Sequence, residues 1–376
     1  MHVTAISHDD LGAVAGNFQG RPAVLHYGDA AAEYRAVRTA AGLSDLSGRG
    51  KLRMTGADRQ RFLHRVVTND VEQLGPGEGV YACMLTPQGK IISDMTVHVR
   101  GEDLLIDVEP GMAEVLRDTL DRYALMDDVE ISDVTAQYGL IGVSGRRADD
   151  CIQGLAGPLT PLPPGGNAET ELSGVPATVA RTHRTGEQDY DIYVPAGSAD
   201  EIWKALLAGA EDSEGDSEGD GAGGGAGGGV PCVPIGYETL EVLRVEAGIP
   251  RCTAELDERI IPNEAVKDRA VSFTKGCYIG QEPVVMMEHR GRPNRLLSGL
   301  VIEGETLPEP SAVIRKDGKE AGWITTAVHG RVVDGIIALG FVRRRSMATG
   351  GPMEVEVDGA PARAEIADLP FYNPGS

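Results

Sequence analysis

The sequence predicts a protein of mixed α and β structure that ends in a small β-barrel. Helical and strand patterns alternate along most of the chain, and beyond about residue 295 only short strand-like runs follow one another. The chain has 376 residues, which is more than one hydrophobic core usually serves. We therefore expect two or three domains.

The first part of the chain carries both helical and strand periodicities of apolar residues. Residues 51–54 and 104–108 have the composition of strands, and residues 57–66 read as a short helix. Residues 112–123 place apolar side chains at helical spacing. A further helix is expected over residues 237–247, where Gly248 and Pro250 would end it.

The last part of the chain is a series of short strand patterns. The dipeptide Asp317-Gly318 lies between two of them, and Asp-Gly favours the primed turn of a β-hairpin. A small C-terminal β-barrel follows from this succession. The expected strands cover residues 297–302, 312–315, 322–326, 335–342 and 353–357.

One segment has the composition of an insertion. Residues 211–229 are acidic at first and then almost pure glycine and alanine, so they lack the apolar groups that would offset the entropy of ordering. Hydrophobic sequence resumes directly afterwards. We expect a flexible surface loop and not a domain boundary.

Charge and cysteine content exclude several classes of protein. The formal net charge is −22, which disfavours binding to nucleic acid or to anionic membranes and resembles proteins of salt-loving microbes. No run of about 18 apolar residues occurs, and the N-terminus lacks a signal-peptide pattern, so a cytoplasmic location is expected. Five widely spaced cysteines without a C-x-x-C pair indicate neither a disulfide framework nor a metal site.

The most distinctive segment is the octapeptide 275–282, Lys-Gly-Cys-Tyr-Ile-Gly-Gln-Glu. Gly276 and Gly280 permit backbone conformations that other residues avoid and let a ligand approach the main chain. Cys277 is the member whose reactivity depends most on its surroundings, because only the thiolate is a strong nucleophile. A cysteine in such a place is also commonly a small buried apolar residue, so the residues alone leave both roles open.

The octapeptide resembles the Lys-Gly-Cys-aromatic-x-Gly-Gln-Glu signature of the YgfZ-type folate-binding proteins. These are relatives of the glycine-cleavage T protein, an aminomethyltransferase. Further segments resemble the same family in the same order, and the acidic composition suggests a halophilic archaeon as the source. The segments are 42–47, 67–70, 89–94, 243–248, 261–265 and 369–372.

The resemblance implies a cloverleaf of two interleaved α/β folate-binding domains, over residues 1–292, and a C-terminal β-barrel over residues 293–376. It also implies a central pocket for tetrahydrofolate. Asp94 would lie beside the pterin and assist aminomethyl transfer, and Glu187 would accept hydrogen bonds from the pterin ring. Arg244 matches an arginine near the folate, although charges on an amphipathic helix usually face solvent.

The same resemblance makes Cys277 the reactive group beside the ligand. Lys275, Tyr278 and Gln281 of the octapeptide are expected to contact the cofactor. Arg290, in a locally basic stretch, suits the anionic tail of a folate. Two positions depart from the family pattern: Arg184 stands where the T protein usually has tyrosine, and Met286 stands where an arginine is common.

Two functions agree with these residues. The first is a tetrahydrofolate-binding protein of the YgfZ type that supports assembly or repair of iron–sulfur client enzymes, which the octapeptide and the segment 47–51 favour. The alternative is an aminomethyltransferase that moves an aminomethyl group from a lipoyl carrier protein to tetrahydrofolate and releases ammonia, which Asp94 favours. A folate-dependent role in RNA modification is weaker, because the acidity argues against RNA contact.

Overall fold

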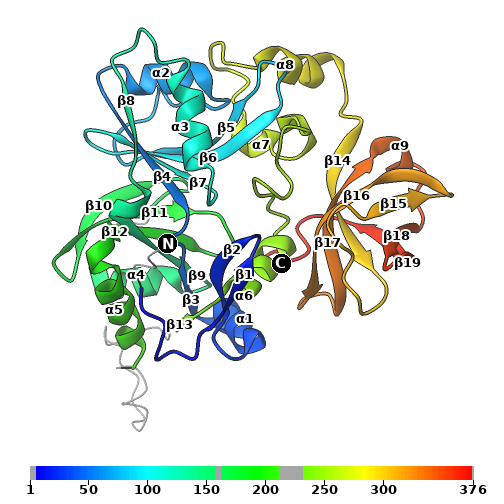
Figure 1. The fold of residues 1–376 in the computed structure, drawn as a ribbon, viewed down its shortest axis with the longest axis horizontal. Coiled ribbons are helices and arrows are strands. Elements are labelled where there is room, and N and C mark those ends of the chain that lie inside the picture. The colour runs from blue at the N-terminus through cyan, green and yellow to red at the C-terminus, as the bar shows by residue number, and fades with distance from the viewer. Residues whose placement is uncertain (1–5, 157–161, 212–231, 375–376) are drawn as a thin grey trace, which may run out of the picture.

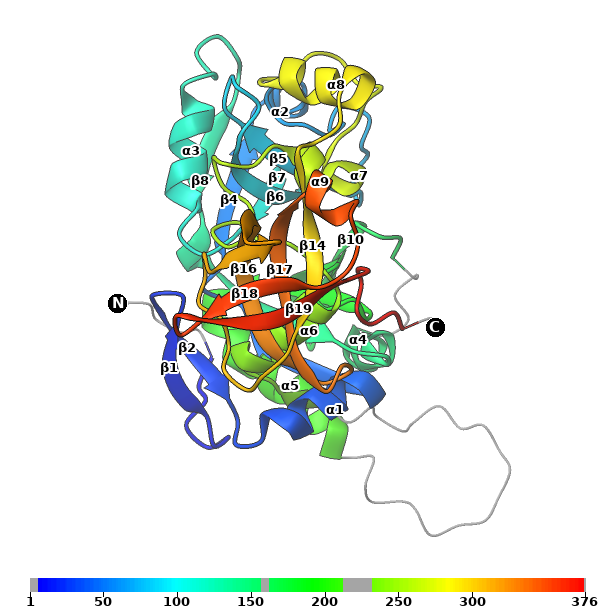
Figure 2. The same ribbon diagram turned by 90° about the vertical axis from the view of Figure 1, so that its right-hand side faces the viewer.

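The computed structural model describes residues 6–156, 162–211 and 232–374. Two α/β bodies lie next to each other, and a β-barrel stands to one side of them (Figure 1). Seen from the barrel side, the barrel strands cross in front of the α/β bodies (Figure 2). None of the helices in these ranges is both long and apolar enough to cross a membrane.

One body is built on a five-stranded sheet with the order β5-β6-β7-β4-β8. Helices α2 and α3 pack on it, and their apolar side chains join those of the strands in one core. The strands are β4 (Gly50–Thr55), β5 (Gly79–Leu85), β6 (Ile91–Val99), β7 (Leu104–Val108) and β8 (Glu130–Asp133). The helices are α2 (Arg59–Val66) and α3 (Ala113–Asp121), and η1 (Thr135–Gln137) follows β8.

The other body is built on a six-stranded sheet with the order β10-β11-β12-β9-β3-β13. Helices α4 (Ala148–Ala156) and α5 (Ala199–Glu211) pack against its core, and η2 (Ala196–Ser198) precedes α5. Its strands are β3 (Ala41–Asp45), β9 (Tyr138–Ser144), β10 (Asn167–Leu172), β11 (Val175–Thr182), β12 (Asp189–Pro195) and β13 (Cys232–Pro234).

The two bodies are interleaved in sequence. Strand β3 pairs antiparallel with β9, although the whole five-stranded sheet lies between them along the chain. The hairpin of β1 (Val14–Phe18) and β2 (Arg21–His26), with α1 (Ala30–Thr39) and α6 (Tyr237–Glu246), flanks the six-stranded sheet (Figure 1). Three short helices then lead toward the barrel: η3 (Pro262–Glu264), α7 (Lys267–Ala270) and α8 (Gln281–Arg290).

The C-terminal strands form a closed barrel with the order β14-β17-β16-β15-β18-β19. The hairpin between β15 and β16 turns at Asp317 (φ 52°) and Gly318 (φ 74°), so both central residues have the positive φ of the predicted primed turn. The strands are β14 (Arg295–Ile302), β15 (Val313–Lys316), β16 (Lys319–Gly330), β17 (Gly335–Arg343), β18 (Met353–Val357) and β19 (Ala360–Ala367), and α9 (Arg344–Met347) follows β17.

The predicted fold class is confirmed: two interleaved α/β bodies precede a closed β-barrel. The division at residues 292/293 stays a prediction, and the insertion expected over residues 211–229 lies outside the described residues apart from Glu211. One expectation is wrong, because a disulfide joins Cys151 of α4 to Cys232 of β13. The two residues are 81 positions apart, so spacing in the sequence could not reveal that sheet formation brings them together.

Candidate functional site

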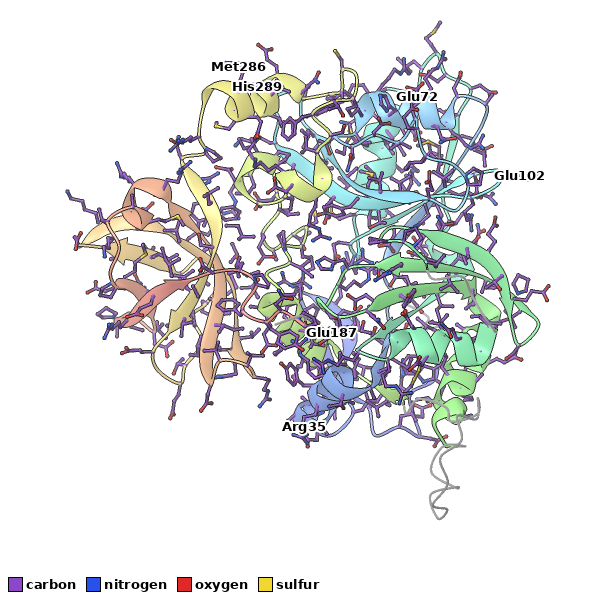
Figure 3. All side chains as sticks on the ribbon, turned by 180° about the vertical axis from the view of Figure 1, so that it is seen from behind. Arg35, Glu72, Glu102, Glu187, Met286 and His289 are labelled. Carbon is purple, nitrogen blue, oxygen red and sulfur yellow. A yellow bond between two sulfur atoms is a disulfide. The ribbon has the colours of Figure 1, made fainter. Side chains whose placement is uncertain are left out.

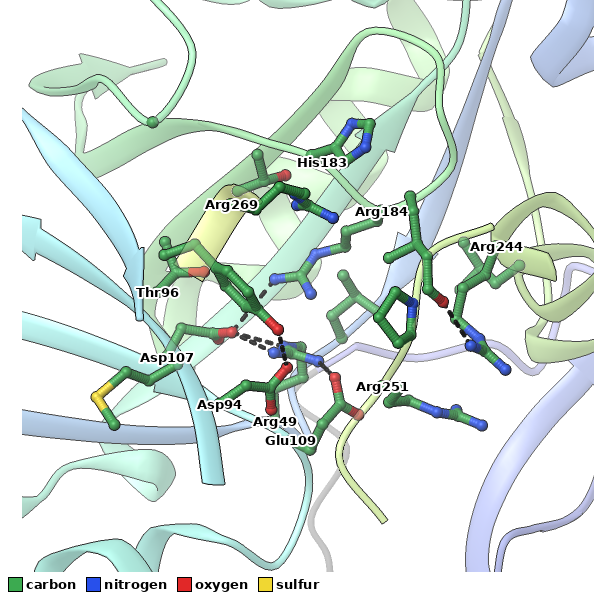
Figure 4. Close-up of a pocket in the computed structure, with 18 of the residues that line it drawn as sticks. Arg49, Asp94, Thr96, Asp107, Glu109, His183, Arg184, Arg244, Arg251 and Arg269 are labelled. Carbon is green, nitrogen blue, oxygen red and sulfur yellow. Dashed lines mark hydrogen bonds and ion pairs between the residues drawn. The ribbon is translucent and has the colours of Figure 1, made fainter. Parts of the chain in front are cut away.

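A cavity of about 500 Å³ opens between the two sheets, beside α6. It is lined from strands of both sheets, from α6, from the loop that follows α6 and from α7. Figure 4 shows Asp94, Asp107 and Glu109 beside Arg49 and Arg184 at its wall. Of the residues expected at the site, Asp94, Glu187 and Arg244 line this cavity.

Asp94 lies in the middle of β6 and is only 8% exposed. It pairs across the sheet with Cys83 of β5, and its carboxylate lies at the wall of the cavity. The Tyr81 hydroxyl donates a hydrogen bond of 2.7 Å to Asp94 Oδ2 and fixes the orientation of the carboxylate. Burial, reinforced by the nearby Glu109 carboxylate, raises the pKa of Asp94 to about 6.

A buried network of charges forms the floor of the cavity and joins the two sheets (Figure 4). Arg49 donates through Nε to Asp107 at 2.8 Å and also pairs with Glu109. Arg184 spans Asp107 and Asp191, with Nη2 at 3.3 Å from Asp107 Oδ1 and Nε at 3.0 Å from Asp191 Oδ1. The two arginines hold the pKa of Asp107 at about 2 even though it is fully buried. This network fixes β7 of one sheet against β12 of the other.

Glu187 lies in the turn between β11 and β12 and lines the cavity. Its Oε1 accepts from Arg38 Nη1 of α1 at 2.7 Å, and its side chain is only 2% exposed. A carboxylate held at the wall of a polar cavity is suited to accept hydrogen bonds from an amino-substituted ring. The ligand-binding role expected for Glu187 stays a prediction.

Arg244 lines the cavity but is held by protein acceptors. Its guanidinium donates to Glu241 at 2.7 Å, to Glu255 at 2.9 Å and to the Ile249 carbonyl at 2.6 Å. It is 7% exposed, so the sequence-based expectation of a charge facing solvent is wrong. Because these acids occupy its donors, Arg244 shapes the cavity wall by fixing the loop after α6, and nothing in its geometry favours the expected contact to folate.

Two other arginines at the cavity have fewer protein partners than Arg244. Arg181 of β11 donates to the Leu162 carbonyl at 2.8 Å, and Arg269 of α7 stacks over Tyr81 with its guanidinium carbon 5.2 Å from the ring centroid. Within the part of the chain that the structure describes, neither arginine takes part in an ion pair with a carboxylate. They give part of the wall a positive charge that suits an anionic group on a ligand.

The octapeptide does not reach this cavity. The Lys275 ammonium is directed at the end of α2 instead, where it donates to the carbonyls of His64, Val67 (2.7 Å) and Asn69 (2.9 Å). Burial lowers its pKa to about 8. A cation at the C-terminus of a helix satisfies carbonyls that have no partner within the helix. The expected cofactor contact of Lys275 is replaced by this capping role.

Two other residues of the octapeptide, Tyr278 and Gly280, serve packing and backbone geometry. Tyr278 is 7% exposed within an apolar cluster that includes Cys83 and Leu85, and its burial raises the pKa of its hydroxyl to about 12. Gly280 has φ of 76° and is the N-cap residue of α8, and a Cβ there would lie 2.4 Å from the Thr86 carbonyl oxygen. A glycine is therefore required at position 280, both for the positive φ and because the neighbouring loop at Thr86 approaches so closely.

Cys277 is exposed and lines none of the described cavities of appreciable size. Gln281 begins α8 and is likewise absent from their walls, and the side chain of Arg290 lies outside the described part of the chain. In Figure 3, Met286 and His289 of α8 lie at the top of the view, and Glu187 lies well below them, near the middle of the molecule. None of the octapeptide residues therefore lines the cavity that holds Asp94 and Glu187.

Sequence reasoning missed several residues of the cavity, among them Arg49, Tyr81, Asp107 and Glu109. One signal was available for Asp107, because a charged residue within the apolar run of β7 must be paired when the strand is buried. Arg184, which stands where the T protein usually has tyrosine, pairs with Asp191.

A second cavity of about 300 Å³, under the β1–β2 hairpin, shares Glu109 and Arg251 with the first.

Comparison with known proteins agrees with this arrangement. The GCVT N-terminal domain matches residues 5–223, and the glycine cleavage T-protein C-terminal barrel domain matches residues 295–373. An aminomethyltransferase of Rubrobacter xylanophilus is 32% identical over 97% of this chain and 92% of its own length. An aminomethyltransferase of Geobacillus kaustophilus is 31% identical over 96% of this chain and 95% of its own length.

The fold also matches a solved structure. The glycine cleavage system aminomethyltransferase T from Bartonella henselae superposes with a TM-score of 0.84 over 98% of this chain and 96% of that chain, at 22% identity. A cloverleaf of two interleaved α/β bodies and a β-barrel, with charged side chains at a central cavity, is the class that the fold and the site define. The chain belongs to the glycine-cleavage T-protein family, and this assignment rests on both domains and on relatives that match nearly its whole length.

Proposed function

We propose that this protein is an aminomethyltransferase that transfers an aminomethyl group from a lipoyl carrier protein to tetrahydrofolate and releases ammonia. The observation that carries the proposal is Asp94: it lies on the wall of the central cavity, in a chain whose full-length relatives are aminomethyltransferases. Such a carboxylate, with a pKa of about 6, is ionised at neutral pH yet close enough to titration to exchange a proton.

The cavity residues fit a reduced folate. A volume of about 500 Å³ lies within the usual range for small-molecule sites. Tyr81 and Tyr237 supply aromatic surface, Asp94 and Glu187 supply acceptors for an aminopyrimidine edge, and Arg181 and Arg269 supply positive charge for an anionic tail. When bound, tetrahydrofolate supplies the nitrogen that accepts the one-carbon unit.

Residues of the protein itself have three further roles in the proposed reaction. Asp94, oriented by the Tyr81 hydroxyl, holds negative charge where positive charge develops on the reacting group and exchanges a proton there. Glu187, held by Arg38, orients the ligand. The network of Arg49, Asp107 and Arg184 keeps the two sheets, and hence these two acids, at a fixed separation.

The iron–sulfur function expected from the octapeptide is less well supported. It required Cys277 beside the folate, and Cys277 is exposed and lines neither of the two cavities described above. The relatives over the whole chain are aminomethyltransferases, which favours the transfer reaction.

The test is a direct assay of the purified chain with an aminomethylated lipoyl carrier protein and tetrahydrofolate. We expect ammonia release that requires both substrates, measured in low and in molar salt because the net charge of −22 is typical of proteins from salt-rich habitats. Omitting tetrahydrofolate is the control. Absence of folate-dependent ammonia release at every salt concentration would contradict the proposal.

A further inference from the structure

After β19 the chain runs back from the barrel to the α/β region (Figure 1). The backbone N–H of Tyr372 donates to the Glu246 carbonyl, the last residue of α6, at 3.1 Å. Leu369 and Phe371 pack in a cluster with Val245 and barrel residues. The C-terminal segment 369–372 therefore contacts both α6 and the barrel, at the junction between the α/β region and the barrel domain.

Glu246 is a fully buried carboxylate that connects three parts of the molecule. Its Oε1 accepts from the backbone N–H groups of Arg331 (2.8 Å) and Val332 (3.0 Å), which lie in the barrel loop between β16 and β17. Its Oε2 accepts from Tyr34 at 2.7 Å and from Arg38 Nη2 at 2.6 Å, both on α1. A buried acid with four donors sets the position of α1 against the barrel.

Arg38 is the link from this junction to the cavity. One guanidinium nitrogen pairs with Glu246 and another with Glu187, which lines the cavity wall. The ring of Tyr372 covers a face of the same guanidinium, with 3.6 Å between the guanidinium carbon and the ring centroid. The Arg38 side chain is 10% exposed, so the ring excludes water from an ion pair that would be weaker if it were solvated.

We propose that Tyr372, acting through Arg38, is a positioning residue for Glu187, so that the C-terminal segment of the barrel domain completes the ligand cavity. The aromatic face keeps Arg38 in the one orientation that reaches Glu246 and Glu187 together. Loss of that face leaves Arg38 free to turn toward solvent and releases Glu187 from its place on the wall. The choice of ligand for the test rests on the proposed function.

The test compares Tyr372→Ala, Tyr372→Leu and Tyr372→Phe in the full-length protein. Tyr372→Ala removes the ring and Tyr372→Leu keeps apolar bulk without a π face, so both are expected to raise the KM for tetrahydrofolate about 3- to 10-fold while kcat changes less than about twofold. Tyr372→Phe keeps the face and is expected to retain the wild-type KM. Tyr123→Ala, at a tyrosine 40% exposed beyond α3, is the matched control.

A second comparison identifies Glu187 as the residue through which Tyr372 acts. In a Glu187→Gln background, Tyr372→Leu is expected to raise the KM no further, because the carboxylate that it positions is already lost. A lower melting temperature with an unchanged KM in Tyr372→Leu, or additive effects in the double variant, would overturn the positioning role. If the wild-type protein itself neither binds nor uses tetrahydrofolate, the proposed function fails instead, so the two failures are distinguishable.

Discussion

The central cavity and the octapeptide 275–282 make opposite use of chemically capable residues. The cavity is assembled from single residues of distant strands, such as Asp94 and Glu187, and each of them looks ordinary in the sequence. The octapeptide is conspicuous in the sequence, yet Lys275 caps α2, Tyr278 fills a core, and Cys277 is exposed and lines neither of the two described cavities. A sequence motif rich in reactive residue types can therefore serve local packing, while residues that are distant in the sequence are brought together at the cavity by the fold.

The largest effect that would sharpen this comparison is expected from Asp94→Asn. Removing the carboxylate charge and its proton exchange should lower kcat for ammonia release by about 10²- to 10⁴-fold, measured with saturating substrates. Glu102→Gln changes the same charge at an exposed turn after β6 and serves as the control (Figure 3). Equal activity of Asp94→Asn and wild type would remove Asp94 from the mechanism.

The same substitution should stabilise the fold in a pH-dependent way. Burial raises the pKa of Asp94 from 3.8 to about 6, so the folded protein binds more protons than the unfolded chain in this interval. Stability from the protonated acid is present below pH 4 and is lost as the pH rises through about 6. Asp94→Asn should therefore match wild type near pH 4 and exceed it by about 3 kcal/mol at pH 7, in denaturant unfolding. A constant difference across pH would contradict the burial of the charge.

A smaller effect, on stability alone, is expected at Lys275. Lys275→Met leaves the carbonyls at the end of α2 without their donor, which should lower the free energy of unfolding by about 1–3 kcal/mol. Its KM for tetrahydrofolate should not change. Lys90→Met is the matched control, because Lys90 donates to a single exposed carbonyl, that of Arg259. A raised KM without lost stability would return Lys275 to the ligand site.

The smallest effect is expected at Cys277. Because its thiol is exposed and lines none of the described cavities, Cys277→Ser should change stability by less than about 0.5 kcal/mol and leave folate affinity and ammonia release unchanged. Calorimetric titration with tetrahydrofolate and the ammonia assay measure these two quantities. A loss of transfer activity in this variant would show that the octapeptide takes part in the chemistry after all.

Local patterns predicted much of the fold. Strand β7 was predicted with its observed bounds, and the Asp317-Gly318 turn was predicted from its dipeptide. Strand β19 was missed because its alanines and Pro361 give it little strand character before pairing with β14 and β18. The interleaving of the two sheets followed from family resemblance, since the pairing of β3 with β9 leaves no local signal.

The site was predictable only in part, for the same physical reason. Asp94, Glu187 and Arg244 were placed at the cavity by resemblance, but the partner of each is remote in sequence, as Arg38 is from Glu187. These pairings decide whether a charged side chain is free to bind a ligand or is already paired with protein groups, as Arg244 is with Glu255 and Glu241. Composition and spacing cannot supply this information, because burial and long-range contacts determine it.

A crystal structure of the protein with bound tetrahydrofolate tests the central claim most directly. We expect the pterin ring in the central cavity, within hydrogen-bond distance of Asp94 and Glu187 and remote from the sulfur of Cys277. A folate bound against Cys277 and α8, with the central cavity unchanged, would contradict it.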